Sequence, residues 1–153
     1  MVVTLKLLSR YFTLIEAEAA LPEAERLLNV CMASKRDYDE ADVKLTEFTQ
    51  RIAVSGGMNV SRSEVAELNQ RRDAAGRKLK SAVDGITDMG VQLKDLDIGL
   101  LDFPTLYKGE EVYLCWRLGE SGIRFWHNVS DGFRGRQPID SEFLHNHCGE
   151  SPV

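Results

Sequence analysis

Apolar side chains recur at alternating steps of three and four residues along two separate stretches of the chain. The first stretch runs from Ala24 to Ile52 and the second from Val65 to Met89, with Ser55-Gly-Gly57 between them. This spacing places the apolar side chains along one face of an α-helix and is typical of a coiled-coil seam. The pattern therefore predicts a pair of long helices over residues 22–89.

The two seams match each other when the second is read backwards. Phe48 would face Leu68 and Ala41 would face Ala75, and pairs along the whole length have residue numbers that add up to 116 or 117. The same register brings an acidic stretch, residues 37–42, next to a basic stretch, residues 71–80. We therefore expect an antiparallel helical hairpin.

The ends of the predicted helices carry recognisable local signals. Thr13-Leu-Ile-Glu16 and Ser61-Arg-Ser-Glu64 are capping boxes, and Gly90 is a natural helix stop. Pro22 follows the first box closely, and the residue before a proline avoids the α region. The sequence thus predicts a short helix over about residues 14–20, followed by a new or kinked helix with Pro22 in its first turn.

After Gly90 the apolar period changes from helical spacing to alternation, which is typical of β-strands. Three short strands are expected, over residues 91–97, 111–118 and 122–128, with Phe103-Pro104 and Lys108-Gly109 in the first connection. The predicted fold is α+β and mostly α: a long coiled-coil-like hairpin followed by a small three-stranded antiparallel meander at its base. Residues 11–139 would form one domain with a loop at 129–139, preceded by an extension (1–10) and followed by a loosely ordered tail (140–153).

Composition and charge exclude several classes of protein. The chain has 153 residues and a net charge of −5, and residues 93–153 carry six basic against ten acidic side chains. An acid excess disfavours binding to nucleic-acid backbones. No apolar run approaches the ~20 residues that span a bilayer, and the start does not resemble a signal peptide. Three scattered cysteines suggest neither a disulfide framework nor a zinc knuckle, so we expect a cytoplasmic protein.

Several motifs resemble one known family. They are Phe12-Thr-Leu-x-Glu16-Ala17 with Leu21-Pro22, the stretch from Val91 to Pro104, Tyr113-Leu-Cys-Trp-Arg-Leu-Gly-Glu120, Phe125-Trp-His127 and Gly132-Phe-x-Gly-Arg-x-Pro138. Together they resemble the bacterial family called domain of unknown function 2203, over residues 11–139. The resemblance implies no activity, because the family has none established.

The predicted hairpin has more apolar surface than a small sheet can cover. Each helix of about thirty residues would be roughly 45 Å long. Leu28, Ala66, Ala74 and Val83 widen the apolar stripe beyond the seam. We therefore expect a homodimer in which a second hairpin covers the first.

Eight of the twelve aromatic residues lie between Phe103 and Phe143, interleaved with charged side chains. Aromatic bodies beside charged groups are common at recognition surfaces. Strand alternation places Tyr113, Arg117, Arg124 and Trp126 on one sheet face. With Arg136 from the loop that follows, they form a predicted aromatic and arginine patch, open to a protein partner or a small anionic ligand. The leading hypothesis is a dimeric, non-enzymatic binding or assembly module. A salt-bridged sheet face is the structural alternative for these arginines.

The alternative function is a divalent-metal site, possibly in a metal-dependent enzyme. His127 with Asp97, Asp102 and Glu120 supplies nitrogen and oxygen ligands, although His127 could equally be a hydrogen-bonded core residue. In the tail, His145, His147 and Cys148 could also chelate a metal. No motif supports nucleophilic catalysis, because alternation places Cys115 and His127 on opposite sides of their strands.

Overall fold

The computed structural model describes residues 10–56 and 61–149, which divide into two compact units. The sheet unit comprises residues 10–28 and 83–149, and the hairpin unit comprises residues 29–82. Because the units share two helices, the chain leaves the sheet unit in one helix and re-enters it in the other. The N-terminal extension, apart from Arg10, and residues 150–153 of the tail lie outside the described residues.

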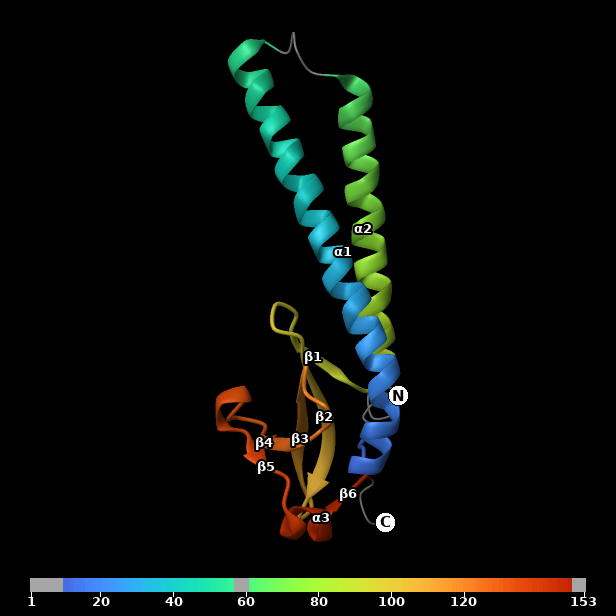
Figure 1. The fold of residues 1–153 in the computed structure, drawn as a ribbon, viewed down its shortest axis with the longest axis vertical. Coiled ribbons are helices and arrows are strands. Elements are labelled where there is room, and N and C mark those ends of the chain that lie inside the picture. The colour runs from blue at the N-terminus through green and yellow to red at the C-terminus, as the bar shows by residue number, and fades with distance from the viewer. Residues whose placement is uncertain (1–9, 57–60, 150–153) are drawn as a thin grey trace, which may run out of the picture. The chain divides into compact units, whose positions relative to one another are not determined.

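The hairpin unit is formed by the larger parts of helix α1 (Leu14–Ser55) and helix α2 (Arg62–Asp88), which run antiparallel (Figure 1). Ser34, Ala41, Ala75 and Ala82 of the two seams are buried. The acidic stretch lies next to the basic stretch, as expected, because Arg71 pairs with Glu40 at 3.1 Å and with Asp37 at 3.6 Å, and Arg72 pairs with Asp42 at 3.2 Å.

Local signals fix three of the helix ends. The N–H of Glu16 donates to Thr13 Oγ1 at 3.1 Å while Glu16 Oε1 accepts from the N–H of Thr13 at 3.2 Å, which completes the first capping box. The N–H of Glu64 donates to Ser61 Oγ at 3.3 Å at the start of α2. Gly90 ends α2 with φ 84°, and Val91 N–H donates to Ile86 C=O in a Schellman motif.

Helix α1 continues through Pro22, so the expected separate short helix over about residues 14–20 is wrong. A proline inside a helix removes one hydrogen bond and costs about 3 kcal/mol. Ala17 and Leu21 before the proline and Ala24 and Leu28 after it are all buried in the sheet unit. Their burial keeps both sides of Pro22 in one helix.

The sheet has six strands, where three were expected. Their bounds are β1 (Gln92–Asp95), β2 (Leu100–Tyr107), β3 (Glu110–Arg117), β4 (Phe125–Asn128), β5 (Gln137–Pro138) and β6 (His147–Cys148). The order is β1-β2-β3-β4-β5, all pairs are antiparallel, and β6 also pairs with β2.

The main difference from the predicted sheet is β2. The prediction assigned this segment to a connection because it contains Pro104. β3 pairs with every residue of β2, whereas β1 and β6 pair only with its two ends. The carbonyl of Pro104 points into the gap between β1 and β6, where it accepts from the N–H of Phe12 at 2.7 Å. The N–H and C=O of one strand residue point the same way, so the missing N–H of Pro104 removes no bond to β3.

Residues 140–149, expected to be part of a loose tail, form helix α3 (Ser141–Asn146) and strand β6. Asp140 Oδ1 accepts from the N–H of Phe143 at 2.8 Å and caps α3. Phe143 is buried and stacks against both Tyr107 and Trp126, which extends the core. In the segment between, residues 133–135 form the short 3-10 helix η1 (Phe133–Gly135). None of the described helices is long and apolar enough to cross a membrane.

Candidate functional site

Polar and reactive side chains gather on one face of the three central strands. The register pairs Asp102 of β2 with Cys115 of β3, and Tyr113 of β3 with His127 of β4. Directly opposed residues share a sheet face, and so do residues two apart in a strand. All four side chains therefore lie on one face, which we call the polar face.

The centre of the polar face is a buried pair of His127 and Asp102. The Nε2 atom of His127 lies 3.1 Å from Asp102 Oδ1 and 3.0 Å from Asp102 Oδ2, and both side chains are 2 % exposed or less. The Nδ1 atom lies 2.7 Å from the carbonyl oxygen of Asn128. A carbonyl can only accept, so Nδ1 carries a proton, and the imidazole is cationic when Asp102 is ionised.

The environment of His127 favours its charged form. Burial lowers the pKa of His127, but hydrogen bonds to Asp102, Cys115 and the Asn128 carbonyl, with the charge of Asp102, raise that pKa to about 10. At neutral pH the pair is therefore a salt bridge inside the sheet unit. A buried charge pair of this kind requires both partners, because either ion left alone would carry its full desolvation cost.

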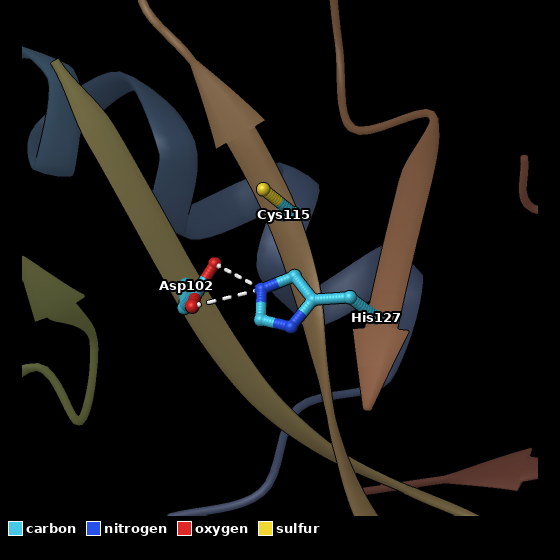
Figure 2. Close-up of side chains that lie close together, drawn as sticks. All are labelled: Asp102, Cys115 and His127. Atoms are coloured by element: carbon cyan, nitrogen blue, oxygen red, sulfur yellow. Dashed lines mark hydrogen bonds and ion pairs between the residues drawn. The ribbon is translucent and has the colours of Figure 1, made fainter. Parts of the chain in front are cut away.

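Cys115 completes a cluster of three different donor atoms. One ligand atom from each of Asp102, Cys115 and His127 lies within 4.8 Å of the others, and all three residues are buried. Figure 2 shows that Asp102 and Cys115 both approach the imidazole from the side of its Nε2 atom. Among residues 10–56 and 61–149, no other group of three metal-binding side chains comes this close together.

Arg136 borders the cluster on its Cys115 side. Its guanidinium lies 4.0 Å from the centre of the Phe125 ring and 4.4 Å from that of Phe133, and it pairs with Glu120 at 2.8 Å. Burial lowers the pKa of Arg136, but Glu120 and Cys115 raise it above its ordinary value. Arg136 and Glu120 are about one-fifth exposed, at 18 % and 20 %, so the cluster has a partly solvent-accessible border on this side.

Of the four metal ligands predicted from sequence, the structure brings together two, Asp102 and His127. Glu120 instead accepts from Arg136 and from the N–H of Arg117. Asp97 lies in the turn between β1 and β2, where its N–H donates to Asp95 Oδ1 at 2.9 Å. The tail residue His147 accepts from the N–H of Leu14 through Nε2 and contacts the Leu144 carbonyl through Nδ1. Both ring nitrogens of His147 therefore have partners within the fold.

The predicted ligand patch does not form one surface. Tyr113 lies on the polar face, but Trp126 is on the opposite face, where it stacks with Tyr107 and Phe143. Arg117 is exposed beside Phe133, and Arg124 precedes β4 and donates to Ser121 Oγ. Two members of this set reach the cluster: the Tyr113 ring lies 5.5 Å from that of His127, and Arg136 borders Cys115.

The sequence alone did not identify Cys115 as a neighbour of His127. Alternation was counted within each strand, without knowledge of which residues of β3 and β4 lie opposite each other. With Tyr113 opposite His127, Cys115 shares the side of His127, so the expectation of opposite sides is wrong. A usable signal was the single acidic residue Asp102 between the apolar Leu101 and Phe103. An acid embedded in a buried stretch requires a partner.

A family model for an uncharacterized conserved protein, DUF2203, matches residues 10–139. This match covers most of the chain and includes all three cluster residues, and the chain belongs to this family. No curated protein and no solved structure shows significant similarity to the chain.

Proposed function

We propose that this member of the DUF2203 family binds one divalent metal ion of the zinc class through Asp102, Cys115 and His127. The observation that supports the proposal is the convergence of oxygen, sulfur and nitrogen donors from three adjacent strands within 4.8 Å. Thiolate, imidazole and carboxylate are the three side-chain types that bind zinc. Hard ions such as magnesium prefer oxygen donors alone.

The orientation of His127 also supports this assignment. Histidine ligands of metals commonly donate their second ring N–H to a carbonyl or carboxylate, which fixes the ring. Here the Nδ1–H of His127 donates to the Asn128 carbonyl at 2.7 Å, and Nε2 faces the other two donors. A metal at Nε2 would leave the bond to Asn128 intact.

Charge balance favours a divalent ion in this buried site. Before binding, ionised Asp102, protonated His127 and the Cys115 thiol have a combined charge of zero. The ion would displace one proton from His127 and one from Cys115, so carboxylate, thiolate and the divalent ion again have a combined charge of zero. A buried site penalises any net charge, so monovalent and trivalent ions are disfavoured.

The same geometry argues against Cys115 as a nucleophile activated by His127. A triad requires one ring nitrogen on the thiol and the other on the acid. Nε2 already faces Asp102 and Nδ1 is bonded to the Asn128 carbonyl, so neither nitrogen is available as a base. We therefore propose a binding role; three protein donors leave the fourth tetrahedral position to water or a small anionic ligand. A thiolate ligand suits a reducing compartment, which supports a cytoplasmic location.

The test is cobalt and zinc binding to metal-free protein. We expect one ion per chain, a thiolate-to-cobalt charge-transfer band and a higher melting temperature with zinc, because binding to the folded state alone stabilises it. Cys115→Ser, which keeps the His127–Asp102 pair, should lose the band and most of the affinity. Cys148→Ser is the matched control and should behave like the parent protein.

Two results would contradict the proposal. One is metal-free protein that binds neither ion and shows no shift in melting temperature. The other is cobalt binding with a spectrum that Cys115→Ser does not change, which would place the ion elsewhere. Elemental analysis of the protein as purified would then identify any resident ion.

A further inference from the structure

One face of the hairpin unit carries two shallow hollows that share Arg71. The hollow near the inter-helix turn has Phe48 and Leu68 among its lining, and the other has Ala74 and Ala75. Phe48 and Leu68 are only half-buried, and no described residue of the hairpin unit covers either hollow. We call this continuous surface the hairpin groove.

Charged side chains stand at the four corners of the hairpin groove with alternating sign. Near the turn, Lys44 of α1 lies across from Glu64 and Glu67 of α2. Toward the other end, Asp37 of α1 lies across from Arg77 and Lys78 of α2. Each helix therefore reverses its sign along the groove, and the two helices do so in opposite directions.

A surface with alternating corners is complementary to itself. If a second hairpin faces the first across a twofold axis parallel to the helices, α1 meets the partner's α2 at the same level, and every corner meets the opposite sign. If the axis instead runs across the helices, each helix meets its own copy end for end, and the signs are again opposite. A uniformly charged face would repel its copy under both operations.

We propose that the hairpin groove is the interface with a second copy of this chain. The twofold copy would cover Phe48 and Leu68 and give oppositely charged neighbours to Lys44, Glu64, Glu67 and Lys78, which have no ion-pair partner within the described residues. Asp37 is already paired with Arg71, so its corner contributes less to the attraction between the two copies. This inference is independent of the metal site.

The size of the groove sets the expected strength of association. Asp37 and Phe48 are eleven residues apart, which is about 17 Å of helix, and two helices side by side are about 20 Å wide. A patch of this size is at the low end of specific interfaces, so we expect a reversible dimer at tens to hundreds of micromolar protein. Because the corner charges are exposed, the dimer should weaken when salt rises from about 0.05 to 0.5 M.

Sedimentation of the full chain over this concentration range tests the proposal. Lys44→Glu should weaken the dimer at least about tenfold at low salt, because it places like charges at two symmetry-related corners. Arg36→Glu makes the same change in charge on an exposed part of α1 outside the groove, and should leave the dimer intact. Circular dichroism melts of both variants would show that the hairpin remains folded.

A compensating charge identifies the axis. Lys44→Glu combined with Glu67→Lys restores the dimer if the axis is parallel to the helices, and Lys44→Glu combined with Asp37→Lys restores it if the axis runs across them. Rescue by either pair supports the proposal. A monomer at every concentration in low salt, an unchanged dimer in Lys44→Glu, or rescue by neither pair would overturn it.

Discussion

At the residue scale, the feature with most chemical consequence is the burial of two opposite charges on one sheet face. The bonds between Asp102 and His127, with that from His127 to the Asn128 carbonyl, leave no buried side-chain polar atom of this pair unsatisfied in the described residues. Such pairs add little net stability over apolar residues of the same size, but breaking one is costly. The pair therefore makes the sheet unit sensitive to single substitutions.

Removing one partner of the Asp102–His127 pair should lower the free energy of unfolding more than removing both partners. Asp102→Leu leaves the His127 imidazole buried without its counter-ion, and we expect a loss of about 3–5 kcal/mol of unfolding free energy. Asp102→Leu combined with His127→Leu should recover part of that loss. Urea denaturation of metal-free protein measures both; a double variant that is less stable than either single one would contradict the argument.

The pH dependence of metal-free protein follows from the same pair. The folded-state pKa of His127 is raised to about 10, above the ordinary value of 6.5. The stabilisation is therefore complete below about pH 6.5 and is lost as pH rises through 10. Unfolding free energies of parent and His127→Gln proteins should converge over this window. If their difference is constant from pH 6 to 10, the ring is not charged in the folded protein.

At the element scale, helix α1 contains a proline where an uninterrupted hydrogen-bond ladder would be stronger. Pro22 is exposed, and apolar residues buried in the sheet unit flank it on both sides. The helix is thus maintained by packing and not by local preference. This explains why a local reading of the sequence ended the helix there.

Replacing the proline tests this account. Pro22→Ala restores an N–H donor and a favourable helix residue, and we expect stabilisation of up to about 3 kcal/mol. Glu23→Ala, at the adjacent exposed position, removes only the surface pair with Arg26 and should change stability by less than about 1 kcal/mol. Thermal melts compare the two. Lower stability in Pro22→Ala would mean that the packing of α1 depends on the proline.

The elements that the sequence predicted well are those whose signals are local. The hairpin follows from heptad spacing and the capping boxes at Thr13 and Ser61, which involve neighbours a few residues away. β2 was missed because Pro104 is acceptable only where neighbouring strands leave a gap, and that gap is a tertiary feature. Without β2, Asp102 could be proposed as a ligand, but its neighbour Cys115 could not be found.

At the scale of the whole molecule, the segment after the family match still contributes to the core. The match ends at residue 139, yet Phe143 of α3 is 1 % exposed and stacks with Tyr107, Trp126 and His147. His147 in turn accepts the N–H of Leu14 at 3.1 Å. The C-terminal segment therefore closes over the start of α1.

Two substitutions at neighbouring positions of α3, one buried and one exposed, should differ clearly in their effect on stability. Phe143→Ala removes a buried ring and should cost about 3–5 kcal/mol. Leu144→Ala alters a side chain that is 44 % exposed and should cost less than about 1 kcal/mol. Chemical denaturation measures both. Equal effects would show that α3 does not pack on the sheet as described.

The contact between Leu27 and Gly85 has a consequence for how this chain can vary in length. A Cβ atom at Gly85 would lie 3.1 Å from the Leu27 side chain, and both residues belong to the sheet unit. The chain thus departs and returns at neighbouring points, and everything between is an insertion with adjacent ends. Removing one matched heptad from each helix should preserve the seam and leave unchanged the zinc affinity that we propose for the sheet unit. The hairpin unit can therefore differ in length between chains without any change in the sequence of the sheet unit.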